Sequence, residues 1–439
     1  MSIVLTRALH VRRELAALCV AAASLLCATA LAQNAPTLSL ADALRLAQER
    51  SRGLAAQDAA VAAAREMAVA AGQRPDPVLR AGINNLPIDG PDRFTLTRDF
   101  MTMRALGVAQ ELTRADKLQA RSDRFEREAQ AAGAARALAL ANLRRDTALA
   151  WLERSLQERL RALLLQQREQ AALQIDAAEA AYRGGRGAQG DVFAARLGVA
   201  QLDDRIAQTE RQAASATTGL ARWIGSAAAQ PLAEAPAADT VALQLAELED
   251  RLAHHPQIEL LAQREAVAQA EAQVARSNRK PDWNVELMFS QRGPAYSNML
   301  SLNLSVPLQW DRANRQDREL GARLALAQQL GAEREEATRA HVAEAAAMLQ
   351  EWQAERARLA RYDQMLVPLA GERTRAAITA YRSNTGPLSA VLEARRAELD
   401  TGIERLRLEG DAARLWAQLN FMIPARRETA ATPSVRSIE

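Results

Sequence analysis

Three glycines between residues 185 and 190 carry a spacing that phosphate-binding loops use. Gly185, Gly187 and Gly190 fit the pattern G-x-G-x-x-G, which binds a nucleotide when it follows a strand and opens a helix. Here the run follows a long segment of helical pattern, and Asp191 stands where the lysine of a phosphate-binding loop would be. We therefore interpret the glycines as a turn between two helices and not as a nucleotide site.

Histidine and methionine are the remaining candidates for binding a metal. His254 and His255 are adjacent and His341 is distant in the chain; adjacent side chains on a helix point about 100° apart, and no carboxylate or cysteine stands at ligand spacing. Met101 and Met103 share a strand face, which packing explains more simply than a soft-cation site. No G-x-S-x-G pattern occurs. We expect no catalytic residue, no cofactor and no metal site, and hence no enzyme.

The N-terminus has the form of a secretory signal. Arginines precede an apolar stretch over 15–31, and Ala30-Leu31-Ala32 fits the small-residue rule for cleavage. We predict a signal peptide at 1–32; an uncleaved membrane anchor is the alternative. Both cysteines, Cys19 and Cys27, lie in this segment, and each follows a leucine instead of the small residue of a lipoprotein signal. Cleavage would leave no thiol, which excludes disulfides, thiolate ligands and cysteine nucleophiles.

Composition favours long helices over several compact cores. The chain has 439 residues, of which 25% are charged and only 4% aromatic, and alanine and leucine dominate its apolar part. The formal net charge of +3 gives no reason to expect nucleic acid as a partner.

The chain contains its pattern twice. Three landmarks recur in the same order, at offsets of 199, 206 and 196 residues: Ala181-Tyr182-Arg183 as Ala380-Tyr381-Arg382, Arg74-Pro75-Asp76 as Lys280-Pro281-Asp282, and Leu106, Val108 and Leu112 as Leu302, Leu304 and Leu308. Such spacing indicates a tandem duplication. We predict a first repeat at 33–225, a linker at 226–244, a second repeat at 245–424 and a flexible tail at 425–439.

Each repeat has a short region of strand alternation. In the second repeat, apolar residues alternate with polar ones on both sides of Gly293-Pro294, which predicts a hairpin at 282–309; the first repeat has a weaker counterpart at 78–112, blurred by Arg80 and Arg104. A strand with one apolar and one polar face is typical of a membrane β-barrel. A half-buried hairpin of a soluble sheet is the alternative, and either hairpin needs further strands as partners.

Long helices make up the rest. Ser39 is the expected N-cap of the first. From 114 to 182 only Gly133 interrupts the pattern, and leucines step by three or four residues as in a coiled coil, so this helix would reach roughly 100 Å. In the second repeat Pro368 is expected to kink the equivalent helix. Such hairpins and ribbons do not bury themselves alone, which favours oligomerisation.

This combination resembles the TolC-like outer-membrane factors of tripartite efflux pumps. The resemblance rests on the duplicated turns, Tyr182-Arg183-Gly184-Gly185 and Tyr381-Arg382-Ser383-Asn384, and on the strand ends 108–112 and 304–308. It implies a mainly α fold with a transmembrane β-barrel portion: a homotrimer with an α-helical tunnel and a shared 12-stranded barrel. It also implies outer-membrane lipid, a periplasmic adaptor (membrane fusion) protein and an inner-membrane RND pump as partners.

Pro75-Asp76-Pro77 and the following segment 81–86 are more similar to the heavy-metal cation (CzcC-like) subgroup of that family. The sequence thus predicts an exit duct for heavy-metal cations. A multidrug or type I secretion channel is one alternative. A periplasmic coiled-coil adaptor is another, although adaptors normally carry one helical hairpin and this chain carries two.

The resemblance also indicates two sets of site residues. Adaptor docking is expected at the turns near 182–191 and 381–393, at Tyr182, Gly184, Gly185, Gly187, Tyr381 and Gly386. A gate at the tunnel end is expected to involve Asp191, Arg382, Glu393 and the bend at Pro368. The family usually places two acidic residues at the second turn, whereas this chain has Ala390 and Glu393.

Overall fold

The computed structural model describes residues 37–241, 248–252 and 254–422, so the predicted signal peptide and tail lie outside the described residues. The chain forms two compact units. Unit 1 contains the described residues of Met1–Ser51, Leu143–Ala242 and Leu349–Asn420, and unit 2 those of Arg52–Asn142, Leu243–Met348 and Phe421–Glu439. Each unit takes segments from both repeats, so the compact units do not follow the duplication. Among the helices of the described residues, none combines the length and hydropathy needed to cross a membrane.

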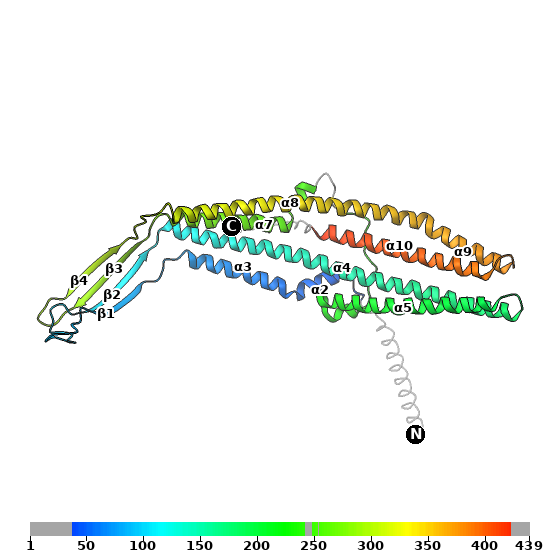
Figure 1. Ribbon diagram of the computed structural model, residues 1–439, viewed down its shortest axis with the longest axis horizontal. Coiled ribbons are helices and arrows are strands. Elements are labelled where there is room, and N and C mark those ends of the chain that lie inside the picture. Colours follow the sequence, from blue (N-terminus) through cyan, green and yellow to red (C-terminus); the bar gives the residue numbers. More distant parts are fainter. Residues whose placement is uncertain (1–36, 242–247, 253, 423–439) are drawn as a thin grey trace, which may run out of the picture. The chain divides into compact units, whose positions relative to one another are not determined.

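Unit 2 combines four strands with helices (Figure 1). The strands are β1 (Val78–Asn84), β2 (Met103–Leu112), β3 (Trp283–Gln291) and β4 (Met299–Ser305), close to where the alternation predicts them. The helices are α3 (Arg52–Ala71), α6 (Leu248–Leu252), α7 (Pro256–Ser277) and the first parts of α4 (Ala115–Arg183) and α8 (Gln316–Arg361). Pro256 in the first turn of α7 follows the N-cap His255, whose Nδ1 accepts a hydrogen bond from the Gln257 N–H at 3.1 Å.

One antiparallel sheet joins the two repeats. Its order is β1-β2-β3-β4, so each repeat supplies one hairpin and the hairpins pair through β2 and β3. In that pairing Val108 lies opposite Leu287, with Leu106 opposite Phe289. Each hairpin was expected to need further strands as partners, and the other hairpin supplies one of them. β1 and β4 are the edge strands of the sheet.

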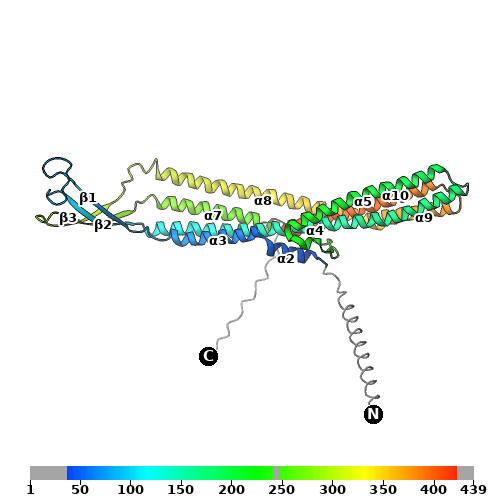
Figure 2. The same cartoon turned by 90° about the horizontal axis from the view of Figure 1, so that it is seen from below.

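Unit 1 is helical. It contains α2 (Leu40–Arg50), the second part of α4, α5 (Gln189–Ile224), the 3-10 helix η1 (Gly225–Ala229), the π-helix η3 (Tyr362–Leu366), α9 (Val367–Arg382) and most of α10 (Leu388–Met422). Within this unit α5 runs beside the second part of α4, and α9 runs beside α10 (Figures 1 and 2). Ser39 caps α2 as predicted, because its Oγ accepts a hydrogen bond from the Asp42 N–H at 3.1 Å.

The beginning of the predicted linker is ordered. Beyond η1, Leu232 forms a parallel bridge with Leu38, whose N–H donates to the Pro231 carbonyl at 2.8 Å. Trp151 is fully buried beside it and donates from Nε1 to the Leu38 carbonyl at 3.2 Å. The segment that joins the repeats is thus held against the start of the first one.

The long helices of the two repeats differ. α4 runs unbroken through 69 residues, whereas its counterpart is divided into α8, η3 and α9. Pro368 stands in the first turn of α9 and has no N–H, and the Val367 N–H reaches back to the Tyr362 carbonyl in the wider π pattern. The predicted irregularity at Pro368 is present, and its form is a π-turn just before the proline.

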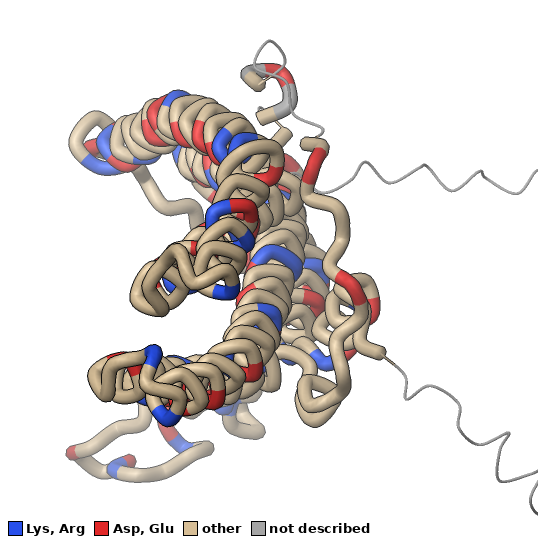
Figure 3. Tube along the Cα trace, turned by 90° about the vertical axis from the view of Figure 1, so that its right-hand side faces the viewer, with Lys and Arg blue, Asp and Glu red and all other residues tan. Residues whose placement is uncertain are grey.

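Charges alternate along the helices of both units (Figure 3). Many of them pair between neighbouring helices, as Arg168 does with Asp203 at 2.5 Å and Arg205 with Asp400 at 3.1 Å. Solvent-exposed pairs of this kind contribute roughly 0–1 kcal/mol each. They help to align neighbouring helices, and basic and acidic positions are interspersed along the described helices in Figure 3.

Candidate functional surfaces: helical turns, sheet face and junction

The turn between α4 and α5 is closed by a set of backbone hydrogen bonds. The N–H groups of Gly184, Gly185 and Arg186 donate to the carbonyls of Ala180, Tyr182 and Ala181 at 3.0, 3.0 and 2.9 Å. Gly185 has a φ of +69°, which glycine adopts at no steric cost. The glycine run is therefore a helix-ending turn, as its context in the sequence predicts.

The turn between α9 and α10 repeats these bonds 199 residues later. The N–H groups of Ser383, Asn384 and Thr385 donate to the carbonyls of Thr379, Tyr381 and Ala380 at 2.9, 3.0 and 2.9 Å. Asn384 takes the left-handed position with a φ of +61°, and asparagine is the residue that tolerates this region best after glycine. A φ requirement of the backbone thus explains both Gly185 and Asn384.

A close contact explains why the residue that ends each turn is glycine. A Cβ on Gly187 would lie 3.1 Å from the Ala181 Cβ, and a Cβ on Gly386 would lie 3.1 Å from the Ala380 Cβ. Real side chains rarely pack this closely. Gly187 and Gly386, two of the predicted docking residues, therefore have the same structural reason to be glycine.

One core cluster ties the two turns together in unit 1. Tyr381 of α9 is among the partly buried residues packed against its buried members, which come from α4, α5 and α10: Ala178, Val192, Ala195, Leu388 and Val391. Tyr182, the counterpart of Tyr381, is 48% exposed. The structure thus brings both predicted docking turns to one end of the same helical bundle, although they are far apart in the sequence.

The gate candidate Asp191 caps a helix. Its Oδ2 accepts a hydrogen bond from the Ala188 N–H at 3.2 Å, at the start of α5. The counterpart of Ala188 is Pro387, which has no N–H to be capped, and the counterpart of Asp191 is Ala390. Position 390 therefore has no N–H donor to cap, which agrees with the absence of an acidic residue there.

The other gate candidates lie on the exposed surface of unit 1. Glu393 pairs with Arg373 of the same chain at 2.6 Å, and Arg382 is exposed. No ion pair of Arg382 is found within the part of the chain that is described. Within one chain the structure therefore pairs Glu393 with Arg373 and not with Arg382.

An ion-pair chain that the sequence did not predict crosses three helical segments of unit 1. Arg159 of α4 holds Glu409 of α10 through two hydrogen bonds of 2.6 and 2.7 Å, and Arg405 contacts Glu409 and Asp363 of η3 at 2.7 Å each. Burial acts to raise the pKa of Glu409, but the Arg159 hydrogen bond and the charges of both arginines outweigh it and hold that pKa below its usual range. The π-turn before Pro368 is thus connected to the neighbouring helices by charge.

The sheet exposes its apolar side. We call the following residues the apolar sheet face: Leu79, Ile83, Leu106, Val108, Leu287, Phe289, Leu300, Leu302 and Leu304. They form cross-strand rows such as Leu302, Leu287, Val108 and Leu79, and Leu300 and Leu302 are 70% and 71% exposed. Leaving one such side chain in water forgoes about 1.5–3 kcal/mol relative to an apolar environment. A face of nine such side chains is therefore suited to an apolar surrounding.

Aromatic residues mark both ends of this face. Trp283 begins β3, and Trp310, which is 88% exposed, follows β4 at the same end of the antiparallel pair. At the other end, the loops that follow β1 and β3 carry the exposed Phe94, Phe100 and Tyr296. Aromatic rims around an apolar band are typical of transmembrane β-barrels, where the rings lie at the membrane–water interfaces.

The opposite face of the sheet is small and polar. Ala105, Gly107 and Ala109 are buried there, and Arg80 of β1 reaches across β2 to pair with Glu286 of β3 at 3.1 Å. A Cβ on Gly107 would come within 2.9 Å of the Leu287 carbonyl oxygen, so only glycine fits. Arg80, which blurs the alternation in the sequence, is therefore a polar-face residue in a regular strand.

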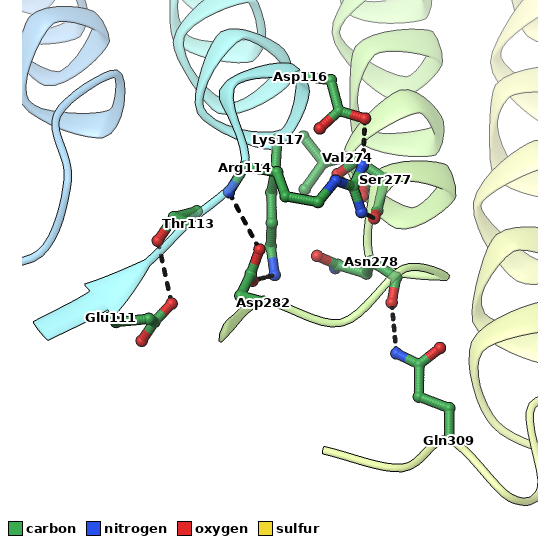
Figure 4. A network of polar contacts seen from close by, with 10 residues as sticks. All are labelled: Glu111, Thr113, Arg114, Asp116, Lys117, Val274, Ser277, Asn278, Asp282 and Gln309. Atoms are coloured by element: carbon green, nitrogen blue, oxygen red, sulfur yellow. Dashed lines mark hydrogen bonds and ion pairs between the residues drawn. The ribbon is translucent and has the colours of Figure 1, made fainter. Parts of the chain in front are cut away.

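A polar network fixes the junction of strands and helices in unit 2 (Figure 4). Asp282, just before β3, accepts a hydrogen bond from the Arg114 N–H at 3.2 Å and pairs with Lys117 at the start of α4. Burial acts to raise the pKa of Asp282, but Lys117 and the Arg114 N–H hold it below its usual range. On the far side, Gln309 donates from Nε2 to the Asn278 carbonyl at 3.0 Å.

The structure brings histidines of distant segments together. The rings of His255 and His341 meet edge to face, with centroids 4.3 Å apart, and His341 Nδ1 lies 3.3 Å from a carboxylate oxygen of Glu344. Across the described ranges, however, no three His, Cys, Asp or Glu side chains are placed to hold a metal ion. We read the pair as packing between α7 and α8.

Comparison with solved structures shows which proteins share this fold. No protein-family model matches the chain, and no curated protein matches it in sequence. The outer-membrane channel OprN is 18% identical over 88% of this chain and 90% of its own, with a TM-score of 0.73. CusC, whose structures concern transmembrane channel formation, is 17% identical over 87% and 92%, with a TM-score of 0.71. The outer membrane protein VceC of Vibrio cholerae is 19% identical over 87% and 95%, with a TM-score of 0.70. The chain therefore has the fold of outer-membrane channel proteins.

Proposed function

We propose that this protein is the outer-membrane channel subunit of a tripartite efflux pump, a passive exit duct and not an enzyme. The apolar sheet face between its two aromatic rims carries the proposal, because it is suited to lipid on one side. The shared fold with OprN, CusC and VceC supports it. The alternative of a periplasmic adaptor has no use for nine exposed apolar side chains on a sheet.

Assembly follows from the incompleteness of one chain. Four strands do not close a barrel that leaves a duct, because the smallest membrane barrels have eight and these are filled by side chains. Three copies would supply twelve strands, which agrees with the trimer that the resemblance to TolC-like proteins implies. The helical units of three copies would then surround the periplasmic part of the duct.

The turns at the end of unit 1 are the proposed docking surface for a periplasmic adaptor, which in turn would recruit an inner-membrane pump. Gly184, Gly185 and Gly187 leave backbone accessible for close approach, and the exposed Tyr182 offers an aromatic anchor. Because the second turn has the same backbone bonds, Tyr381 and Gly386 would offer a related, less exposed surface.

For the cargo we propose heavy-metal cations. The support is the similarity of Pro75-Asp76-Pro77 and of segment 81–86 to the heavy-metal subgroup. A duct needs no binding site for what passes through it, so the metal would be selected by the pump. Deleting the gene and measuring growth on graded metal salts and drugs tests this point; sensitivity to drugs alone would favour the multidrug alternative.

Gating is proposed at the end of unit 1 that carries the turns. Glu393 and Asp191 would be repeated around the axis of a ring, where like charges repel, so removing them should change closure. Asp191→Asn keeps an acceptor for the Ala188 N–H, and together with Glu393→Gln it should raise single-channel conductance. Unchanged conductance in this double variant would show that these carboxylates do not hold the gate.

Fractionation and planar-bilayer recording test the main proposal together. Native protein should appear in the detergent-extracted outer membrane and, once purified, conduct ions across a planar bilayer. As a matched pair of variants, Leu302→Arg places a charge on the apolar sheet face, at a cost of up to about 2–4 kcal/mol in the bilayer, and Ser301→Arg places it on the polar face. Recovery of the native protein in the soluble fraction, with no conductance, would overturn the proposal.

A further inference from the structure

The last row of side chains on the apolar side of the sheet contains a charge. Arg104 of β2 lies opposite Ile83 of β1 and Gln291 of β3, so it is on the same side of the sheet as Leu106. Within two residues of each member of this row the strands give way to loops, at the end of the sheet away from the helices. An arginine on a lipid-facing strand is least costly near such an end, where the membrane meets water.

Arg104 has no partner within its own chain. It is half-buried, and its Nε is buried and makes no hydrogen bond. Among the residues that the structure describes, it also has no ion pair. A guanidinium has five N–H donors and stays charged, and a buried donor without an acceptor is costly. The row is therefore complete only when an acceptor comes from outside the chain.

The loops around this row are packed together. A side chain on Gly293 would have no room beside the Thr97 carbonyl oxygen, and a nitrogen of Arg292 donates to the Phe100 carbonyl. Thr102, which leads into β2, is fully buried. The loops of both repeats thus form one ordered surface at the end of the sheet.

Two further arginines of these loops lie over aromatic rings. The guanidinium of Arg93 is 5.0 Å from the centroid of the Phe94 ring, and that of Arg292 is 4.8 Å from the centroid of the Tyr296 ring. Both rings are exposed, and such contacts are attractive. The aromatic residues that mark this end of the apolar sheet face therefore hold positive charge beside it.

The carboxylates of the same loops leave these arginines without ion pairs. Asp92 pairs with a different arginine, Arg98, at 3.6 Å, and Asp99 accepts hydrogen bonds from two backbone N–H groups at 2.8 and 3.1 Å. Asp89 is exposed, and among the described residues it pairs with none of them. The loop end of the apolar sheet face thus has an excess of positive charge.

We propose that Arg104 binds the phosphate group of a membrane lipid whose acyl chains lie on the apolar sheet face, with Arg292, which follows the strand partner of Arg104, as a second cation. This rests on the proposed membrane function, under which the loop end of the sheet lies at the outer surface, and it specifies the class of lipid bound there. A guanidinium can contact two phosphate oxygens at once. Ile83 and Leu106 adjoin Arg104 on the same side, and an acyl chain would cover them whereas inorganic phosphate would not.

Native mass spectrometry of protein released from a neutral detergent tests the site by counting bound lipids across a titration. The probes are dioleoyl phosphatidic acid and dioleoylglycerol, which share their acyl chains and differ by the phosphate group. Arg104→Gln removes the charge, and Arg104→Lys retains it. Arg98→Gln is the matched control, because Arg98 belongs to the same loops and is already paired with Asp92.

We expect the native protein to bind phosphatidic acid several times more tightly than dioleoylglycerol. Arg104→Gln should weaken the binding of phosphatidic acid about tenfold, because a charge-assisted hydrogen bond is lost. Arg104→Lys should lose less, and Arg98→Gln should match the native protein. Equal affinity of native protein and Arg104→Gln would overturn the proposal, as would equal affinity for the two lipids. Displacement of the lipid by inorganic phosphate would assign the site to the free anion and reject the lipid.

Two further measurements separate this proposal from the others. Loss of oligomer in Arg104→Gln with unchanged lipid binding would assign Arg104 to a contact between copies and overturn the lipid site. Conductance of the native protein in planar bilayers, without any preference for phosphatidic acid, would overturn the lipid site and leave the proposed function standing. Preference for phosphatidic acid without conductance would support the site and count against the channel.

Discussion

The two helical turns of unit 1 are made of different residues and hold the same hydrogen bonds, while the helices that lead into them differ. In each turn three successive backbone N–H groups donate hydrogen bonds to carbonyls of the preceding helix, and one residue has a left-handed φ angle: Gly184-Gly185-Arg186 and Ser383-Asn384-Thr385. In contrast, α4 is unbroken and its counterpart contains a π-turn before Pro368. Duplication thus preserved the backbone requirement of the turn and allowed the helix leading to it to change.

The contacts that hold the two helical pairs also differ. Asp363 of the π-turn forms an ion pair with Arg405. The second hairpin is also without the capping bond that Asp191 makes in the first. The two helical pairs are therefore held by different contacts, a capping bond in the first and an ion pair at the π-turn in the second.

The largest effect is expected where the two turns agree. Gly187→Leu and Gly386→Leu each force a side chain toward an alanine Cβ that is already 3.1 Å from the first added atom. Overpacking of this kind costs about 1–3 kcal/mol, and both variants should lose efflux while oligomer yield is retained. Gly219→Leu is the matched control, because it lies on α5 away from both turns and nothing lies within 4 Å of its Cβ position. Full efflux in either turn variant would show that the close contact relaxes and that docking does not use it.

The next largest effect concerns Glu409, whose ion pairs connect α4 and the π-turn through α10. Glu409→Gln should lower the free energy of unfolding by about 1–2 kcal/mol near neutral pH, because two arginines lose an ionised partner. Since the folded pKa of Glu409 is depressed, its contribution is present above the usual glutamate pKa of about 4.3 and is lost as the pH falls through the folded pKa.

Thermal or denaturant unfolding at several pH values measures this dependence. The native protein should lose stability on acidification more steeply than Glu409→Gln does. Glu336→Gln is a suitable control, because its pair with Arg339 is highly exposed. Parallel pH curves for the native protein and Glu409→Gln would contradict an electrostatic role for the ion-pair chain.

A smaller effect separates the two helix starts that follow the turns. Asp191→Ala should destabilise the start of α5 by about 0.5–2 kcal/mol, the usual cost of losing a capping group. Asp191→Asn should recover most of this, because its side-chain oxygen still accepts the Ala188 N–H. In the second turn Ala390→Asp should bring no comparable gain, because Pro387 has no N–H. Hydrogen exchange of the first turns of α5 and α10 measures the effect; equal protection in Asp191→Ala and native protein would contradict the cap.

The smallest effect tests the left-handed positions. Gly185→Asn should be close to neutral, because Asn384 already occupies the equivalent position at a φ of +61°. Gly185→Val should cost about 1–2 kcal/mol, since a β-branched residue is strained there. The difference in melting temperature between the two variants checks this, and equal melting temperatures would show that the turn changes conformation when substituted.

Several features of the fold were predictable because they depend on local sequence. The N-cap Ser39 and the proline that opens α7 act within a few residues, so their patterns are readable in the chain. Alternation predicted β3 and β4 well and β1 and β2 less well. One reason is Arg80, whose charge is compensated by Glu286 on another strand, which its neighbours in sequence do not reveal.

The candidate site was predictable only in part for the same reason. The duplicated motif pointed to Gly185, Gly187 and Gly386, and the structure supplies a φ angle for the first and a close contact for each of the other two. Their part in docking an adaptor stays a prediction. The chain Arg159–Glu409–Arg405–Asp363 was missed, because acidic and basic residues are frequent on every helix face and nothing in the sequence distinguishes these four.

By itself the sequence determined the duplication, the long helices, the strand faces and the turns, because each follows from spacing and from the preferences of short segments. Only the tertiary structure decided that β2 pairs with β3, that both turns share one core cluster, and that Asp282 joins Lys117 across the junction. These contacts link residues more than 160 positions apart. Their energy depends on which surfaces meet, and a pattern along the chain does not contain that information.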